Sequence, residues 1–442
     1  MTKPIAFLVS TILACVSASA ESNRPNIVLL MADDLGMEAI SVHGGESYKT
    51  PHLDKLANEG FRFDNCFANP LCTPSRAKIM TGQYNVRNYE KFGRLPRSEK
   101  TFAHALKAAG YATAIAGKWQ LGGEKDAPQH FGFDEAFLWY HIGNGRHAGG
   151  IDGRFVNPVI SLNGEPKHYN EGQYGPQLCT DFICDFMEKN RKGPFLVYYP
   201  MILTHCPFDP TPDSPDWDPK RPGSKTYKGP GTKADQQRHF GDMVNYADKI
   251  VGQIVAKLDA LGLRDNTLLI FTGDNGTDKP IVSQWKGRKV VGGKGQMNDT
   301  GTRVPCVVSW PARMKGGQVR LDLVDFTDIY PTLCEAAGIA LPAHYPGDGV
   351  SLVPSIRGAD SRNKPWVYVW YAGKVFARNH AYRVAGNHGK TKYTLTDVST
   401  PFAPKPVDNK KRTAEQKKNY NALLAVIQRL EKTRGDKPVA RR

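Results

Sequence analysis

Apolar and amphipathic segments alternate along the first three quarters of the chain. Short, uninterrupted apolar runs are typical of strands buried on both faces, and apolar residues at helical spacing are typical of helices that cover a sheet. The apolar runs lie at residues 26–32, 111–116, 195–200, 267–272 and 304–310. The helical segments lie at residues 51–59, 101–109, 177–190, 242–261 and 323–337. This alternation predicts an α/β fold with a large, mostly parallel sheet sandwiched by helices.

The pattern changes after about residue 340. Pro346-Gly347-Asp348-Gly349 marks a linker, and short strand-like segments follow it, before a long amphipathic segment near the C-terminus. The short segments are residues 366–371, 381–385 and 392–398, and the long one is residues 414–432. We therefore expect a large domain over residues 21–340 and a smaller subdomain over residues 341–442, built from an antiparallel sheet and a helix.

The first twenty residues have the pattern of a secretory signal peptide. Lys3 provides the positive end, an apolar stretch follows, and Ala18-Ser19-Ala20 is a small-residue cleavage site. The sequence thus predicts an exported protein, periplasmic or secreted. Cys15 loosely resembles a lipoprotein cleavage site, which leaves membrane anchoring as an alternative. Nothing later in the chain has the length and apolarity of a transmembrane segment.

Polar side chains follow four of the predicted strands. Asp33-Asp34, Lys118, Thr204-His205 and Asp274-Asn275 each come at or just after the end of a strand. In open α/β sheets, ligands bind outside the carboxyl ends of the strands, so we expect these residues to meet at one edge. The two acidic pairs form an all-oxygen ligand set, which favours calcium or magnesium over zinc or copper. The alternative is that they are helix N-caps.

The stretch from Pro70 to Gly82 reads as a loop that enters a helix. Thr73 is the expected N-cap, Pro74 suits the first helical position, and Gly82 is expected to end the helix. Cys72 would then lie at a helix N-terminus, where free amide groups favour an anion, with the positive Arg76 close by. This predicts a reactive cysteine beside an anion site. A buried or disulfide-bonded cysteine is the alternative, and the pairing of the other cysteines stays open.

Cys72-Thr73-Pro74-Ser75-Arg76, followed by Thr81-Gly82, resembles the signature of the formylglycine-dependent (type I) sulfatases. Residues 110–119, with Lys118, resemble the second signature of that family, and His205 and Lys294 lie in segments that match further family patterns. The resemblance extends over residues 24–340. It implies an alkaline phosphatase-like fold and hydrolysis of sulfate esters.

The resemblance also implies a role for each matching residue. Cys72 would be converted to formylglycine (3-oxoalanine) by a sulfatase-maturing enzyme, and its hydrate would attack sulfur. Arg76 would steady the oxygens of this nucleophile. One calcium ion would be held by four residues, Asp33, Asp34, Asp274 and Asn275. Three residues would hold the sulfate, namely Lys118, His205 and Lys294, and His205 or Lys294 would protonate the leaving alcohol.

Gln120 departs from the family pattern, in which a histidine or leucine is expected at this position. Glutamine still forms hydrogen bonds, and we expect it to contact the substrate, but it cannot take up a proton near neutral pH. The departure therefore affects the step in which the family releases sulfate.

The composition bears on the substrate. A formal net charge of +16 favours polyanionic partners, and we find none of the usual nucleic-acid recognition motifs. For an exported protein, a sulfated carbohydrate is the better match. Two alternatives remain open: a phosphoester or phosphonate hydrolase with the same fold, and a carbohydrate-binding relative with weak catalysis.

Overall fold

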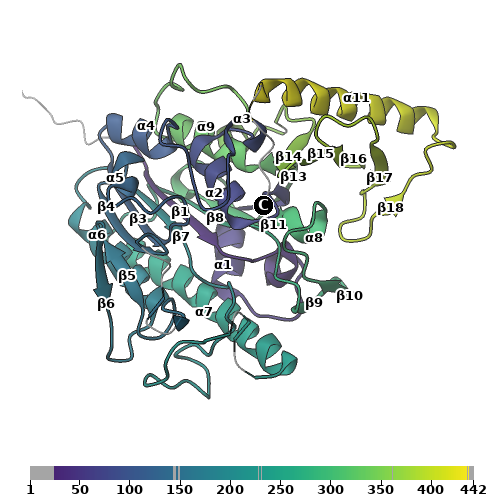
Figure 1. Ribbon diagram of the computed structural model, residues 1–442. Coiled ribbons are helices and arrows are strands. Elements are labelled where there is room, and N and C mark those ends of the chain that lie inside the picture. Colours follow the sequence, from purple (N-terminus) through teal and green to yellow (C-terminus); the bar gives the residue numbers. More distant parts are fainter. Residues whose placement is uncertain are drawn as a thin grey trace, which may run out of the picture.

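The computed structural model (Figure 1) describes residues 24–142, 146–147, 150–226, 228–229, 231–360, 362–435 and 437. The expected signal peptide, residues 1–20, lies outside this range. The described chain forms a large sheet with helices on both faces and a second, smaller sheet at one side.

Five neighbouring parallel strands form the centre of the large sheet. In spatial order they are β8 (Thr267–Gly273), β1 (Asn26–Ala32), β7 (Phe195–Pro200), β3 (Ala112–Lys118) and β4 (Glu135–Trp139). Every residue of β1, β7 and β8 is buried, as the uninterrupted apolar runs predict. Side chains alternate along β1, so that Leu29 faces one half of the core and Leu30 the other.

Shorter strands extend the sheet on both sides. Beyond β8 lie β12 (Cys306–Ser309), β2 (Phe61–Phe67), β11 (Arg303–Val304) and β13 (Gln318–Asp325). Beyond β4 lie β5 (Val159–Leu162) and β6 (Glu165–His168). Several of these pairs are antiparallel, so the sheet is mixed but mostly parallel through its centre.

Three helices cover one face of the sheet, and three others cover the opposite face. The first group is α1 (Pro51–Glu59), α6 (Gly175–Lys189) and α7 (Lys233–Ala260). The second is α2 (Cys72–Thr81), α4 (Phe102–Ala108) and α9 (Ile329–Ala336). The mostly parallel α/β sandwich expected from the sequence is thereby confirmed.

The C-terminal part forms an antiparallel sheet with a helix across it (Figure 1). Its members are β14 (Val367–Tyr371), β15 (Lys374–Arg378), β16 (Tyr382–Asn387), β17 (Thr394–Asp397), β18 (Lys405–Pro406) and α11 (Ala414–Glu431). This agrees with the expected small sheet and helix, while the domain boundary at residue 340 stays a prediction.

Short elements connect these layers. The helices are α3 (Asn85–Asn88), α5 (Ala127–His130), α8 (Asp299–Thr302) and α10 (Val353–Ile356), and the hairpin strands are β9 (Val282–Trp285) and β10 (Arg288–Val291). The 3₁₀ turns are Met37–Ala39, Ser41–His43, Pro311–Arg313, Phe326–Asp328 and Lys432–Arg434.

Three element predictions were wrong in detail. The expected strand at 304–310 is interrupted at Pro305, because proline lacks the N–H that a ladder requires. The expected helix at 323–337 begins only at Ile329, since Leu323 to Asp325 pair with β2. Helix α7 begins at Lys233 instead of 242, where Thr232 and Asp235 form a capping box.

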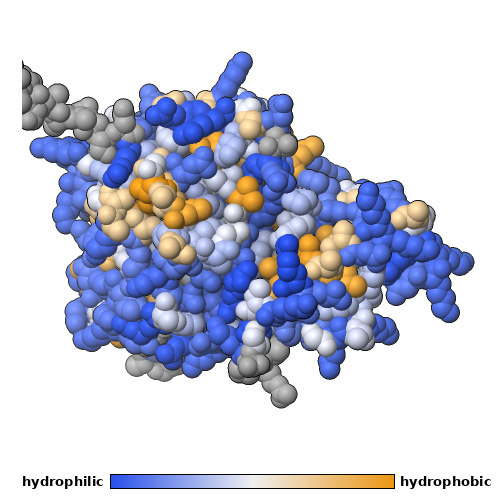
Figure 2. Space-filling view, turned by 90° about the horizontal axis from the view of Figure 1, so that it is seen from above, coloured by the Kyte–Doolittle hydropathy of each residue, from blue (hydrophilic) through white to orange (hydrophobic). Residues whose placement is uncertain are grey.

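The surface seen in Figure 2 is largely hydrophilic, and apolar side chains are confined to separate patches. Within the described ranges, we find no helix that is both long enough and apolar enough to cross a membrane. All seven cysteines in these ranges are free.

Candidate active site

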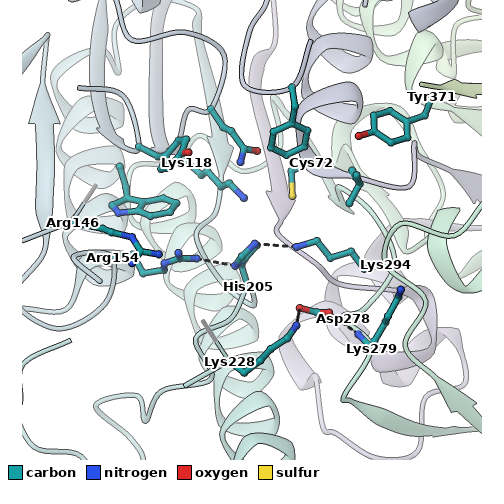
Figure 3. Close-up of a pocket in the computed structure, with 15 residues that line it drawn as sticks. Cys72, Lys118, Arg146, Arg154, His205, Lys228, Asp278, Lys279, Lys294 and Tyr371 are labelled. Atoms are coloured by element: carbon teal, nitrogen blue, oxygen red, sulfur yellow. Dashed lines mark hydrogen bonds and ion pairs between the residues drawn. The ribbon is translucent and has the colours of Figure 1, made fainter. Parts of the chain in front are cut away.

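The ends of β8, β1, β7 and β3 meet at one edge of the sheet, as the order of the strands requires. An open pocket of about 700 Å³ lies at this edge, and Cys72, Lys118, His205 and Lys294 line it (Figure 3). Lys118 and His205 are two of the strand-end residues that were expected to meet at this edge, and Cys72 and Lys294 reach the same pocket from two other segments.

Cys72 is the first residue of α2, and Leu71 is the N-cap. The expected N-cap at Thr73 was wrong, because the helix starts one residue before it, whereas Gly82 ends the helix in the left-handed conformation, as predicted. The Cys72 thiol is buried, and its Sγ lies 3.3 Å from Oδ1 of Asp33. Burial, together with Asp274 and Asp33, raises the pKa of this thiol well above its usual value.

The four predicted metal ligands lie together and are fully buried. The backbone N–H of Asp34 donates to Oδ1 of Asp274 over 3.0 Å, and Nδ2 of Asn275 donates to Oδ1 of Asp34 over 2.8 Å. Oδ1 of Asn275 has no hydrogen-bond partner among the described residues. A buried, unpartnered oxygen beside carboxylates fits a hard cation such as calcium. The residues present therefore fit the ion that the resemblance implies.

Three cations balance these carboxylates. Nζ of Lys118 lies 2.6 Å from Oδ2 of Asp33, and Nζ of Lys294 lies 2.5 Å from Oδ2 of Asp34. Arg76 does not line the pocket but lies behind it, where Nη2 is 3.0 Å from Oδ2 of Asp274. Burial alone would raise the pKa of Asp33, but the charges of Lys118, Arg76 and Lys294 outweigh it and hold that pKa well below the usual value. The site thus combines alternating charges, most of them on buried side chains.

Lys118 depends on the glycine before it. Gly117 has a φ of +111°, and a Cβ at this position would lie 2.1 Å from the carbonyl oxygen of Pro200. Only glycine avoids both the strained backbone and this clash. The backbone of β3 can therefore approach the end of β7 closely, which brings Lys118 beside Asp33.

His205 lies between the cysteine and an outer layer of cations (Figure 3). Its Nε2 is 3.0 Å from Nζ of Lys294, and its Nδ1 accepts a hydrogen bond of 2.8 Å from Nη1 of Arg154. Burial, then the charges of Lys294 and Lys118, lower the pKa of His205 well below the usual value. The imidazole is therefore neutral in this environment.

The sequence interpretation missed Arg154. Its guanidinium pairs with Asp152 at 2.8 Å, lies 4.2 Å from the ring centre of Trp139, and also donates to the carbonyl of Cys206 over 2.7 Å. These contacts hold Arg154 in the pocket wall, where its guanidinium positions the ring of His205. Arg154 lies in a segment without regular spacing of apolar residues, so no local pattern marks it.

Gln120 lines the same pocket, as expected. It has a φ of +55°, and its Oε1 has no hydrogen-bond partner in the part of the chain that the structure describes. The side chain can therefore accept a hydrogen bond from a bound molecule.

The chain is also similar in sequence to known proteins. A family model described as Sulfatase matches residues 25–339, and a second, N-sulphoglucosamine sulphohydrolase, C-terminal, matches residues 291–399. N-acetylgalactosamine-6-sulfatase of Homo sapiens is 31% identical over 385 residues, which cover 80% of this chain and 70% of that protein.

Solved structures give the same picture of the fold. Ps i-CgsB in complex with k-i-k-neocarrahexaose superposes with a TM-score of 0.76 at 22% identity, over 95% of both chains. Phosphonate monoester hydrolase of Agrobacterium radiobacter superposes with a TM-score of 0.68 at 18% identity, over 95% of this chain and 100% of that one. At these identities the two structures show the alkaline phosphatase-like fold alone.

The family model and the curated relative go further than the fold, because they cover most of the chain and are specific to one kind of hydrolase. With the cysteine-containing helix, the acidic cluster and the lysines in one pocket, they establish that this chain belongs to the type I sulfatase family and is a sulfuric ester hydrolase.

Proposed function

We propose that this sulfatase removes sulfate from sulfated carbohydrates, with Cys72 matured to formylglycine and one calcium ion beside it. The observation that supports this most is the cluster around Cys72, which lies at a helix N-terminus beside an all-oxygen ligand set and faces the buried Lys118 and the partly buried Lys294. The relatives' recorded action on sulfated sugars supports the choice of substrate class.

Asp33, Asp34, Asp274 and Asn275 would hold the calcium ion. When present, the ion and the hydrated aldehyde together supply an acidified oxygen nucleophile at position 72. Arg76 is paired with Asp274, and this contact orients a ligand carboxylate while its charge steadies negative oxygens near the helix N-terminus.

The remaining residues act on the sulfate group. Lys118 and Lys294 carry positive charge next to the carboxylates, and both ammonium groups can turn toward the oxygens of a bound sulfate. Nε2 of His205 faces the same space. Either His205 or Lys294 delivers a proton to the oxygen of the leaving alcohol, because both lie on the pocket side of the site.

Maturation and export complete the proposal. A sulfatase-maturing enzyme would oxidise Cys72 before the chain has folded, since the thiol is buried in the folded structure. Residues 1–20 would direct export to the periplasm or the medium, with lipid attachment at Cys15 as the alternative.

The test compares matched aryl sulfate and aryl phosphate esters, a panel of sulfated oligosaccharides, and the Cys72→Ala variant as a control. We expect inorganic sulfate from the sulfated sugars, little phosphate, and no release by the variant. Faster release of phosphate or phosphonate than of sulfate would instead support the alternative of a phosphoester or phosphonate hydrolase. Binding of sulfated sugars without any turnover would support a carbohydrate-binding relative.

A further inference from the structure

The pocket extends beyond the groups that surround the sulfate. On the side of His205 away from Cys72, the close-up shows Lys228, Asp278 and Lys279, and Arg146 lies beside Arg154 (Figure 3). Tyr371 lies on the opposite side, next to Cys72 (Figure 3). These residues line the same pocket but are not among those expected to hold sulfate. They form two outer walls, one cationic and one aromatic.

Tyr371 comes from the C-terminal sheet. It is the last residue of β14, and the hairpin turn that follows has left-handed residues, Ala372 with φ +47° and Gly373 with φ +80°. Its ring meets the ring of Tyr89 edge-on at 5.6 Å, and the residue is only 5% exposed. These contacts fix the direction of its side chain.

The hydroxyl of Tyr371 has no hydrogen-bond partner among the described residues, although its oxygen is buried. In Figure 3 this hydroxyl points into the pocket. A buried, unpartnered polar atom costs free energy unless a ligand satisfies it. Oε1 of Gln120, which lines the same pocket, is likewise buried and without a hydrogen-bond partner among the described residues. Phe92 adds an exposed aromatic face, at 41% exposure, on which the C–H groups of a sugar can stack.

The cationic wall is built around Asp278. Lys228 forms an ion pair with Oδ2 of Asp278, and the backbone N–H of Lys279 donates to Oδ1 over 2.7 Å. Both carboxylate oxygens are therefore engaged. The exposed ammonium of Lys279 has no ion-pair or hydrogen-bond partner in the described ranges, so its charge remains available to a ligand.

We propose that these two walls form a subsite for a sulfated sugar that carries a second anionic group. Tyr371 hydrogen-bonds a substituent of the sugar ring, and Lys279 binds the second anion. The inference rests on the proposed carbohydrate substrate and specifies which carbohydrates are preferred. It also gives the C-terminal subdomain a direct part in substrate selection.

The test measures kcat/KM of the matured enzyme on hexosamine monosulfates, the matching disulfates and para-nitrophenyl sulfate. Two ratios are followed, disulfate over monosulfate and sugar over aryl sulfate. We expect Lys279→Gln to lower the first ratio about tenfold and Tyr371→Phe to lower the second about tenfold, as the loss of one hydrogen bond predicts.

Matched controls separate these effects from general changes. Lys289→Gln removes the same charge from an exposed position in β10 outside the pocket. Tyr368→Phe removes a hydroxyl from the same strand that is also unpartnered but does not line the pocket. Neither control is expected to change either ratio.

The outcomes distinguish this proposal from the one on which it rests. If the wild type cleaves sugars but Lys279→Gln and Tyr371→Phe leave both ratios within about twofold, a difference smaller than a single hydrogen bond, the subsite is wrong and the carbohydrate function stands. If the wild type cleaves only para-nitrophenyl sulfate, both proposals are overturned.

Discussion

Gln120 occupies the position where the resemblance to the sulfatase signature leads us to expect a histidine or leucine. It lines the pocket, but an amide cannot accept a proton near neutral pH, whereas an imidazole can. We therefore expect Gln120→His to accelerate the release of sulfate by up to about tenfold, in the range of weak general base catalysis. Pre-steady-state measurement of aryl alcohol and sulfate release separates the two phases. If Gln120→His changes neither phase, Gln120 does not limit the release of sulfate. Gln120→Leu is the control for a change of side chain that adds no proton acceptor.

Substitution of Asp274 tests the predicted metal site. Burial, together with the neighbouring Asp33, raises its pKa to about 7, so a metal ion beside this carboxylate would favour its ionised form. We expect Asp274→Ala to reduce sulfate release more than about a hundredfold while the far-UV circular dichroism stays that of the wild type.

Chelation followed by repletion provides the control for this variant. The wild type should lose activity after exhaustive removal of metal and regain it with calcium, whereas Asp274→Ala should not regain it. Full turnover by the metal-stripped wild type would contradict a role for these four residues as ligands.

At the scale of elements, a buried charge cluster joins α2 to the chain that leads into the C-terminal sheet. Lys78 of α2 lies 3.4 Å from Oδ1 of Asp325, and Lys364 lies 3.3 Å from Oδ2 of the same residue. Burial would raise the pKa of Asp325, but Lys364 and Lys78 outweigh it and lower the pKa to about 2. The carboxylate is therefore ionised and paired wherever the protein is folded near neutral pH.

This cluster predicts how stability depends on pH. The folded-state pKa of Asp325 lies below the unfolded value of about 3.9, so its contribution is complete above about pH 4 and is lost as the pH falls toward 2. Urea unfolding between these pH values should show this loss. Asp325→Asn should lower the free energy of unfolding at pH 7 by about 3 kcal/mol, because it removes the carboxylate paired with the buried Lys78, whereas Lys364 keeps its ion pair with Asp328. An unchanged stability in this variant would refute the account.

The elements also show how far sequence patterns predict structure. The buried strands, such as β1 and β8, can be predicted from the sequence because both of their faces are apolar and the apolar run is unbroken. β2 was not predicted, because Arg62 and Asp64 interrupt its apolar residues while the strand still pairs on both sides. The strand-end residues of the site were found from the order of strands, but Arg154 and Tyr371 were not, because long-range packing alone brings them to the pocket.

At the scale of the whole molecule, the net charge of +16 should affect encounter with the substrate. Positive charge around the pocket raises the local concentration of a polyanion, and salt screens this effect over about 10 Å at 0.1 M. We expect kcat/KM on a sulfated oligosaccharide to fall several-fold between low and high salt, and to fall less on an aryl sulfate. Equal salt dependence for both substrates would argue against electrostatic steering of the polymer.

The state of residue 72 tests the central claim most directly. Trypsin releases a peptide of residues 63–76 that contains both Cys66 and Cys72, so the first serves as an internal control for thiol labelling. After alkylation of active enzyme from a host with a sulfatase-maturing enzyme, mass spectrometry should find one alkylated thiol at Cys66 and an aldehyde at position 72. Active enzyme whose peptide carries two alkylated cysteines would contradict the formylglycine mechanism.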